Sequence, residues 1–475
     1  MENLTDRKVL VVGLQRSGIG ASLLLRRLGA IVKVADIKTL KDLEALHGKD
    51  MMDLLVSQGI EIKAGGHDEK DFLESELIVI SPGVNTYMPL LVRARRQGID
   101  VIGELELAYQ IVRRGLTPIP YNIPFYAVTG TNGKSTVTTL LYLMLKEAGI
   151  NAHICGNIGK AITMDIIEIM DGRAGIPEAF VVEVSSFQLE TIKGFRPAIA
   201  TILNITPDHL DRYRSLDEYR NAKALIGANM TFEDRLVLNR DDEEISKVIT
   251  QFRSEIYYFT RKAYLEDFQG AFVKDGAIWI NIDKYFELFP IKELKLKGVH
   301  NIENVMASSI MAILGGADTE SIKKVLMEFR GLEHRTEFVG EIDGVVYIND
   351  SKGTNVGALM KSLEGFQNIV LIAGGRDKKG DFSVLRPLVK ERVKALVLIG
   401  EASQKIRDAL GDLTETVFAS DMRDAVKKAR SYARRGDTVL LSPGCASFDM
   451  FRDFEERGRV FKEIVREMKD GSRQN

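Results

Sequence analysis

Hydrophobic positions in the first hundred residues form short apolar runs that are separated by longer amphipathic stretches. The runs lie at Val9–Val12, Val32–Ala35, Leu77–Ile80 and Val101–Ile102. Apolar runs of this length that alternate with helical patterns are typical of a parallel sheet with crossover helices. The pattern therefore predicts a Rossmann-like α/β body at the N-terminus.

The same alternation continues along the rest of the chain. The strands predicted after the first body are Phe180–Val184, Ala200–Leu203, Ile369–Ala373, Ala395–Ile399 and Val439–Leu441. A helix is also predicted over Ser321–Phe329, with Gly331 as its stop signal. The Asp343-Gly344 turn predicts a hairpin that joins Phe338–Ile342 to Val345–Ile348.

Three prolines mark a break in this pattern. Pro118, Pro120 and Pro124 follow the first body closely, and proline fixes φ and removes a hydrogen-bond donor. We therefore predict a linker near residues 115–124. A chain of 475 residues is too long for one core. The predicted α/β domains are an N-terminal Rossmann-like parallel sheet (1–118), a central P-loop ATPase-type domain (119–331) and a C-terminal Rossmann-like domain (332–475).

A phosphate-binding loop opens the central domain. The apolar strand Phe125–Val128 leads into Gly130, Gly133, Lys134 and Ser135, and a helical pattern follows. Glycines let backbone N–H groups approach an anion, and the helix N-terminus adds the positive end of its dipole. The lysine would reach the terminal phosphates and the serine hydroxyl would bind Mg²⁺. The loop has Val128 where the general P-loop has its first glycine, but strand and helix flank it correctly, so it predicts ATP binding.

The glycine loop after the first strand resembles a dinucleotide fingerprint only in part. Gly13 and Gly18 fit, but Gln15 stands where a middle glycine lets the pyrophosphate touch the backbone. A nicotinamide dehydrogenase is therefore disfavoured, although Asp36 would still accept a ribose hydroxyl. Binding of another nucleotide and simple helix capping both stay open. The turn at Ser81 and Gly83 favours the nucleotide, because it opens on the same sheet edge.

Two further strand ends carry candidate chemistry. Glu183 ends an apolar strand, where a carboxylate is either a Mg²⁺ ligand or a buried structural group. His209 lies in a loop after another strand, a position that also suits an ordinary surface histidine. By spacing alone, Lys223 is interpreted as a solvated helix lysine.

Composition excludes several classes of protein. The net charge of −2 gives no bulk attraction to nucleic acid or membrane. No apolar run approaches the roughly 18 residues of a spanning helix, and no signal-peptide core precedes the first strand. Two distant cysteines, Cys155 and Cys445, suggest reduced thiols. We expect a cytoplasmic enzyme, monomeric, with no nucleic-acid or membrane partner.

Taken together, the motifs resemble those of the Mur ligase family in order and spacing, over essentially the whole chain. The central motifs are Gly130-Thr-Asn-Gly-Lys-Ser-Thr136, Glu183-Val-Ser-Ser-Phe-Gln-Leu189, Asn204-Ile-Thr-Pro-Asp-His209, Ala222-Lys223 and His300-Asn301-Ile-Glu-Asn304. The C-terminal motifs are Gly331-Leu-Glu-His-Arg335, Asp350-Ser-Lys-Gly-Thr-Asn355, Gly374-Gly-Arg-Asp-Lys378 and Leu441-Ser-Pro-Gly-Cys-Ala-Ser-Phe-Asp449.

The resemblance implies an ATP-dependent amide ligase of cytoplasmic peptidoglycan precursor synthesis. The C-terminal motifs point to the member that adds D-glutamate to UDP-N-acetylmuramoyl-L-alanine through an acyl-phosphate intermediate. ATP, two Mg²⁺ ions and a CO₂-derived carbamate on Lys223 are the implied cofactors. The implied partners are these small-molecule substrates.

Residue roles implied by the resemblance follow position by position. The catalytic residues would be Lys134, Glu183, His209 and Lys223. The metal ligands would be Ser135, Glu183, His209 and carbamylated Lys223. ATP would contact Gly130, Thr131, Asn132, Gly133, Lys134, Ser135, Thr136, Asn301, Asn304, Arg335 and Asp350. The UDP substrate would contact Arg16, Ser17, Asp36, Ser81, Gly83 and Asn157. D-Glutamate would contact Lys352, Thr354, Lys378, Ser447 and Phe454.

Gly353 and Gly444 depart from the usual family pattern, where alanine is common, but neither position carries assigned chemistry. The alternatives are a sister ligase adding L-alanine, a diamino acid or a dipeptide, a folate polyglutamate ligase, and a non-catalytic nucleotide-binding regulator. The C-terminal motifs argue against the first and the nucleotide-like first domain against the second. The joint presence of Lys134, Glu183, His209 and Lys223 argues against the third.

Overall fold

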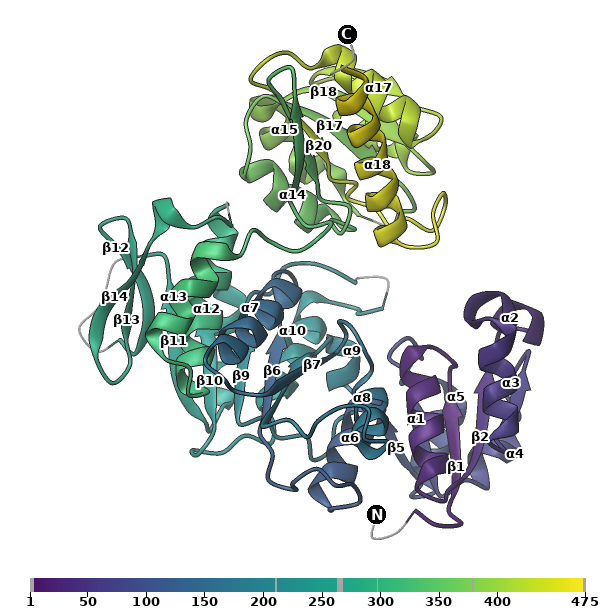
Figure 1. Ribbon diagram of the computed structural model, residues 1–475. Coiled ribbons are helices and arrows are strands. Elements are labelled where there is room, and N and C mark those ends of the chain that lie inside the picture. The colour runs from purple at the N-terminus through teal and green to yellow at the C-terminus, as the bar shows by residue number, and fades with distance from the viewer. Residues whose placement is uncertain (1–3, 210–211, 263–267, 297, 378–379, 473–475) are drawn as a thin grey trace.

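The structure is a computed structural model that describes residues 4–209, 212–262, 268–296, 298–377 and 380–472. Figure 1 shows three bodies, with the N-terminal one in purple and the C-terminal one in yellow-green. Over the described residues, each body is built on its own sheet. The three-body α/β fold predicted from the sequence is confirmed, while the domain boundaries at 118 and 331 remain predictions.

The described residues of the N-terminal body form a five-stranded, all-parallel sheet in the order β3-β2-β1-β4-β5. Its strands are β1 (Lys8–Val12), β2 (Ile31–Asp36), β3 (Glu61–Ala64), β4 (Leu77–Ile80) and β5 (Asp100–Gly103). Its helices are α1 (Arg16–Arg27), α2 (Leu40–His47), α3 (Lys49–Ser57), α4 (Glu69–Leu73), α5 (Pro89–Arg96) and α6 (Glu104–Arg113). The sequence missed only β3, an edge strand whose residues alternate between exposed and half-buried. Because β1 pairs with β4, the loops that follow these two strands lie side by side.

The central sheet has nine strands among the described residues, in the order β14-β13-β12-β11-β10-β9-β6-β8-β7. Its strands are β6 (Phe125–Thr129), β7 (Ala152–Gly156), β8 (Ala179–Glu183), β9 (Ile199–Ile202), β10 (Arg235–Asn239), β11 (Glu255–Thr260), β12 (Gly270–Lys274), β13 (Ala277–Asn281) and β14 (Tyr285–Pro290). Its helices are α7 (Lys134–Glu147), α8 (Ile162–Met170), α9 (Ser186–Leu189), α10 (Leu216–Ala224), α11 (Glu243–Ser246), α12 (Val299–Leu314) and α13 (Thr319–Glu328), with short 3₁₀ turns η1 (Leu225–Gly227), η2 (Ile249–Gln251) and η3 (Ile291–Glu293).

The sequence predicted too few strands here. β7 and β10 to β14 have no counterpart in the prediction, and β12 to β14 form an antiparallel extension rather than a parallel one. The outermost strand, β14, keeps several exposed positions, so it lacks the continuous apolar run of a doubly covered parallel strand.

The C-terminal body has six strands among its described residues, in the order β15-β16-β20-β17-β18-β19. They are β15 (Glu337–Ile342), β16 (Val345–Asn349), β17 (Ile369–Gly374), β18 (Val393–Ile399), β19 (Glu415–Phe418) and β20 (Thr438–Leu441). The helices are η4 (Phe382–Leu385), α14 (Val356–Glu364), α15 (Arg386–Arg392), α16 (Ser403–Leu410), α17 (Met422–Tyr432) and α18 (Phe454–Ser472). The predicted hairpin is confirmed as the antiparallel β15–β16 pair. β19 was missed.

The three bodies are joined in different ways. One cluster of buried apolar side chains runs from the N-terminal sheet through α1, α6 and α8 into the central sheet. α1 and α8 approach closely at Gly20, where a Cβ atom would lie 2.3 Å from the Thr163 hydroxyl. The C-terminal sheet instead has a separate apolar cluster on each face. The first two bodies therefore share a core that the third does not.

In the described part of the chain, no helix combines the length and apolar character needed to cross a membrane. Cys155 and Cys445 are both buried free thiols.

A buried carboxylate also ties the first two bodies together. Glu106, on α6, is fully buried and accepts the backbone N–H groups of Lys193, Gly194 and Phe195 at 3.0, 2.8 and 2.9 Å. These N–H groups belong to the loop before β9, so one side chain orients a loop of the neighbouring body.

Glu106→Ala should lower the free energy of unfolding by about 3 kcal/mol or more, because it leaves buried N–H groups without an acceptor. Urea unfolding measures the change. The matched control is Asp100→Asn, which removes an exposed pair with Lys193 at the same junction and should cost less than about 1 kcal/mol. Equal losses in the two variants would contradict the assigned role of Glu106.

Glu104, two residues earlier, titrates abnormally. Burial raises the pKa of Glu104 from 4.5 to about 7. Hydrogen bonds at 2.8 Å from the backbone N–H and the hydroxyl of Thr163 oppose this shift, because they lower the pKa. Its second oxygen has no hydrogen-bond partner among the described residues. The folded protein therefore favours the neutral acid.

A raised pKa of Glu104 makes its contribution to stability fully present below about pH 4.5 and lost as the pH rises to about 7. The stability of the wild-type protein relative to Glu104→Gln should therefore fall across this window, by on the order of 3 kcal/mol. Urea unfolding of both proteins at several pH values tests this. A difference that does not change with pH would show that Glu104 is ionised in the folded state.

Candidate active site

The phosphate loop lies between β6 and α7 at the carboxyl edge of the central sheet. Gly133 has a φ of 89°, and a Cβ atom there would lie 2.3 Å from the Asn304 amide oxygen, so glycine is required. Lys134 begins α7 and donates from Nζ to the carbonyls of Gly130 and Thr131 at 2.7 and 2.8 Å. The loop thus holds an ammonium group where its backbone can also bind phosphate.

Glu183 ends β8, and its register partner on β6 is Val128. The side chain is 2% exposed, and Oε1 accepts a hydrogen bond from the Asn157 amide at 2.8 Å. Oε2 is buried with no hydrogen-bond partner in the described residues. A buried carboxylate oxygen left unpaired beside a phosphate loop fits a ligand for a divalent cation.

The position of Lys223 shows that the interpretation drawn from its spacing is wrong. It is 1% exposed on α10, whereas its spacing indicated a solvated helix lysine. Its Nζ donates to the Gly130 carbonyl at 2.9 Å and lies 4.5 Å from the centre of the Tyr219 ring. Burial, and then the charge of Lys134, lower the pKa of Lys223 well below its usual value. The amine is therefore driven toward its neutral, nucleophilic form.

His209 lies in the loop after β9 with a positive φ of 54°. Its ring packs edge-on against Phe187, with the ring centres 4.8 Å apart, and its Nε2 is 3.7 Å from Asp208 Oδ2. Asp208 Oδ2 also accepts a hydrogen bond from the Asn355 amide of the C-terminal body at 2.7 Å. This loop therefore meets the third body.

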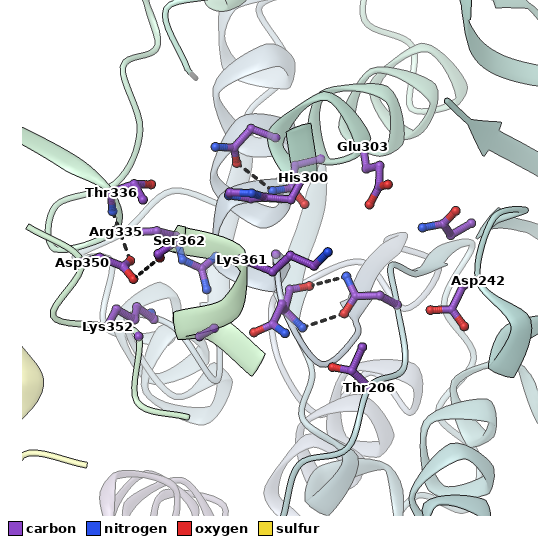
Figure 2. A pocket seen from close by; sticks show the side chains of 18 of the residues that line it. Thr206, Asp242, His300, Glu303, Arg335, Thr336, Asp350, Lys352, Lys361 and Ser362 are labelled. Atoms are coloured by element: carbon purple, nitrogen blue, oxygen red, sulfur yellow. Dashed lines mark hydrogen bonds between the residues drawn. The ribbon is translucent and has the colours of Figure 1, made fainter. Parts of the chain in front are cut away.

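A pocket between the central and C-terminal bodies is lined by six of the eleven residues predicted to contact ATP (Figure 2). They are Asn132, Gly133, Asn301, Asn304, Arg335 and Asp350, whereas Gly130, Thr131, Lys134, Ser135 and Thr136 are not among its lining residues. Asn301 and Asn304 reach it from α12, and Arg335 and Asp350 from the start of the C-terminal body. Thr136 accepts a hydrogen bond from Arg335 Nη1 at 3.0 Å. The prediction that a nucleotide would span this boundary is consistent with where these side chains lie.

Asp350 is buried in this pocket beside Ser362 and Thr336 (Figure 2). Its Oδ2 accepts hydrogen bonds from the hydroxyls of Ser362 and Ser442 at 2.5 and 2.8 Å, and its Oδ1 accepts the Thr336 N–H at 3.2 Å. Burial raises the pKa of Asp350, while these hydrogen bonds and the nearby Arg335 oppose the shift.

Several polar residues that line the pocket were missed from the sequence. They are Thr206, Asp241, Asp242, Arg261, His300, Glu303, Thr336, Lys361 and Ser362. Asp241 and Arg261 follow β10 and β11, two strands that the sequence did not predict. His300 opens a motif that the sequence singled out, and burial lowers the pKa of His300 to about 4, so its ring is neutral.

A second pocket lies between the N-terminal and central bodies. It brings together five residues predicted to contact the UDP substrate, namely Arg16, Ser17, Ser81, Gly83 and Asn157. Asp36 is not among its lining residues. Both Asp36 oxygens accept backbone N–H groups, from Leu14 at 2.7 Å and Lys38 at 2.8 Å, so this carboxylate supports the glycine loop.

The residues predicted to receive D-glutamate are only partly brought together. Lys352 Nζ lies 5.1 Å from the centre of the Phe454 ring and donates to the Ser135 hydroxyl at 3.0 Å. Burial lowers the pKa of Lys352 to about 8. Thr354 follows in the same loop, and Ser447 is buried in the loop after β20. Lys378 lies outside the described residues.

Three family profiles cover most of the chain. They are the Mur ligase MurD-like N-terminal domain over residues 7–103, the Mur ligase middle domain over 128–312 and the Mur ligase glutamate ligase domain over 334–445.

Curated relatives match at full length. Proteins named UDP-N-acetylmuramoylalanine–D-glutamate ligase from Acidobacterium capsulatum and Geotalea uraniireducens are 44% and 42% identical. The alignments cover 97% and 99% of this chain, and 96% and 99% of the relatives.

Solved structures share the fold. The UDP-N-acetylmuramate-alanine ligase MurC of Thermotoga maritima aligns with a TM-score of 0.59 at 22% identity, over 97% of this chain and 100% of that one. The MurF ligase of Thermotoga maritima, solved in complex with ADP, also gives a TM-score of 0.59, at 16% identity, over 98% and 99% of the two chains. On the family profiles and the full-length relatives, the chain belongs to the Mur ligase family.

Proposed function

We propose that this protein is the ATP-dependent ligase that joins D-glutamate to UDP-N-acetylmuramoyl-L-alanine. The observation that carries the proposal is the identity of 42–44%, over 97–99% of the chain, to relatives named for this activity. The family resemblance in the C-terminal motifs supports D-glutamate over the amino acids of the sister ligases.

The geometry supports a continuous path for the acceptor. Asn157 lines the pocket at the N-terminal junction and also donates to Glu183 beside the phosphate loop. A substrate whose diphosphate occupies that pocket, near Arg16 and Ser81, would extend its carboxylate toward the phosphate loop. ATP would enter from the opposite side, between Asn301 and Arg335.

The residues around the phosphate loop fit Mg²⁺. Glu183 offers an unpaired buried oxygen, and Ser135 offers a hydroxyl at the start of α7. His209, in the loop after β9 beside Asp208, would add a nitrogen ligand. Hard oxygen ligands suit this ion. When bound, Mg²⁺ neutralises phosphate charge and polarises the phosphoryl group.

The reaction we propose activates a carboxylate. The alanyl carboxylate oxygen attacks the γ-phosphorus of ATP, the bond to the bridging oxygen breaks, and ADP leaves from the acyl phosphate. The D-glutamate amine then attacks the acyl carbon, loses a proton, and the phosphate departs with the C–O bond electrons. Lys134 would stabilise the charge that moves onto the β-phosphate, and Lys352 supplies a second cation beside Ser135.

Lys223 would be modified rather than act as a cation. A buried neutral amine is the form that adds to CO₂, forming an N–C bond with loss of one proton. The carbamate so formed is an anion, which would be attracted to the nearby Lys134 and could serve as a metal ligand. The low pKa of Lys223 that burial produces supports this assignment.

We also propose that the C-terminal body moves during the cycle. Its described contacts with the loops of the phosphate site are hydrogen bonds rather than a shared apolar core. These hydrogen bonds run from Arg335 to Thr136, from Lys352 to Ser135 and from Asn355 to Asp208. Such contacts exchange readily with water. Closure would exclude water, which otherwise hydrolyses the acyl phosphate. We further propose that the enzyme acts as a cytoplasmic monomer.

Phosphate release from ATP tests the substrate assignment. With UDP-N-acetylmuramoyl-L-alanine present, we expect release with D-glutamate and none with L-glutamate, L-alanine or meso-diaminopimelate. Release with a different amino acid would keep the family and overturn the proposed specificity. No release with any of the four would instead support a nucleotide-binding regulator.

Glu183→Gln separates catalysis from folding. It should lower kcat about 100-fold or more, because it removes a metal-binding charge from the transition state. It should not lower the thermal midpoint, since the amide oxygen can still accept from Asn157 and a buried unpaired charge is removed. The matched control is Glu178→Gln, which lies just before the opposite end of β8 and should retain full activity. An active Glu183→Gln enzyme with unchanged Mg²⁺ dependence would exclude a metal-binding role.

A further inference from the structure

A half-buried hydrogen-bond network around Arg212 joins the N-terminal body to the loop that carries His209. Arg212 follows β9 in the central body, and its side chain is 20% exposed. Its guanidinium reaches into the N-terminal body, where Nη1 donates to the Pro82 carbonyl at 3.1 Å and Nη2 to the Val84 carbonyl at 3.3 Å. The proposed reaction assigns no role to this residue.

Glu190 fixes the guanidinium in that position. One carboxylate oxygen accepts from Arg212 Nη2 at 2.7 Å and from the Thr86 hydroxyl of the N-terminal body at 3.2 Å. The other accepts from the Tyr213 hydroxyl at 2.5 Å. Burial raises the pKa of Tyr213, so the phenol stays protonated and donates. Glu190 is only 14% exposed, which limits screening of its pair with Arg212 by water.

On its central side, the network reaches the candidate metal ligand. The Arg212 guanidinium carbon lies 4.2 Å from the centre of the Phe187 ring. The same ring packs edge-on against His209 at 4.8 Å. Phe187 is therefore held between the guanidinium and the imidazole, so that movement of Arg212 changes the packing of His209.

On its N-terminal side, the network reaches the predicted UDP-binding loop. Pro82 and Val84 belong to the turn that begins at Ser81, where the Val84 N–H donates to the Ser81 carbonyl at 2.9 Å. The Ser81 hydroxyl in turn donates to the Gly13 carbonyl at 2.6 Å. Gly13 opens the loop that leads to Arg16 and Ser17 at the start of α1, two of the residues that line the UDP-side pocket.

We propose that Arg212 is a positioning residue that holds the turn Ser81–Val84 in register with the His209 loop, and so sets the distance between the acceptor's diphosphate and its reacting carboxylate. The inference rests on the proposed function, because it concerns the acceptor of that same reaction. One planar guanidinium contacts two carbonyls, a carboxylate and an aromatic face. A lysine ammonium lacks the planar, forked set of N–H donors that would bond to the two carbonyls and the carboxylate at the same time.

The test measures kcat, KM for UDP-N-acetylmuramoyl-L-alanine and KM for ATP in Arg212→Gln, Arg212→Lys and Thr86→Val. Both arginine variants should raise the acceptor KM about tenfold or more, since charge-assisted hydrogen bonds across the junction are lost. KM for ATP should stay within about twofold, because its pocket lies at the other junction. Thr86→Val, which removes only one hydrogen bond to Glu190, should give a smaller change in the same direction.

The matched control is Arg196→Gln. Arg196 pairs with Asp234 at 2.7 Å and with Glu233 at 3.0 Å, all within the central body. It should lower the thermal midpoint without changing either KM. The proposal would be overturned if Arg212→Lys kept the wild-type KM for the acceptor. It would also be overturned if the arginine variants changed the KM for the acceptor and the KM for ATP equally. If the arginine variants do not fold, Thr86→Val decides. A Thr86→Val protein with an unchanged thermal midpoint and the wild-type KM for the acceptor would overturn the proposal. Inactivity of the wild-type enzyme with D-glutamate would instead count against the proposed function.

Discussion

The parallel pairing of β6 with β8 on one side and β9 on the other is the constraint on which the rest of the site depends. The carboxyl ends of parallel strands lie at the same edge of the sheet, so the loops after these three strands lie close together. The register of Val128 with Glu183 therefore brings the Glu183 carboxylate to the phosphate loop, and the loop after β9 brings Asp208 and His209 to the same edge. A shift of one residue in this register would turn Glu183 toward the opposite face of the sheet.

Charge balance at that edge explains why two lysines can lie so close together. Lys134 is held by the carbonyls of its own loop, and Lys223 donates to one of the same carbonyls, that of Gly130. Two cations near one oxygen repel, and burial removes the water that would screen them. The pKa of both lysines is lowered, more strongly for Lys223. The two lysines of this site therefore differ in how strongly burial favours the neutral amine.

The two junctions between bodies suit different tasks. The N-terminal body shares an apolar core with the central body and is fixed by two acidic side chains, the buried Glu106 and the half-buried Glu190. The C-terminal body meets the phosphate loop through hydrogen bonds such as Arg335 to Thr136. In the proposed reaction, the acceptor would bind at the junction with a shared apolar core, which would keep the length of its site constant. The nucleotide would bind at the polar junction, whose hydrogen bonds would allow it to open and close.

The sequence by itself determined the α/β class, the phosphate loop and the strand-end candidates, because these depend on local patterns of apolar runs, glycines and caps. It could not determine the burial of Lys223 or the backbone-supporting role of Asp36, since spacing along a helix or strand does not say what packs against it. Asp241 and Arg261 were missed although their strands contain apolar runs, because the sequence does not show that the ends of these strands meet the nucleotide-side pocket. Contacts between bodies, such as Arg212 with Pro82 and Val84, were decided only by the tertiary structure, because they join segments about 130 residues apart.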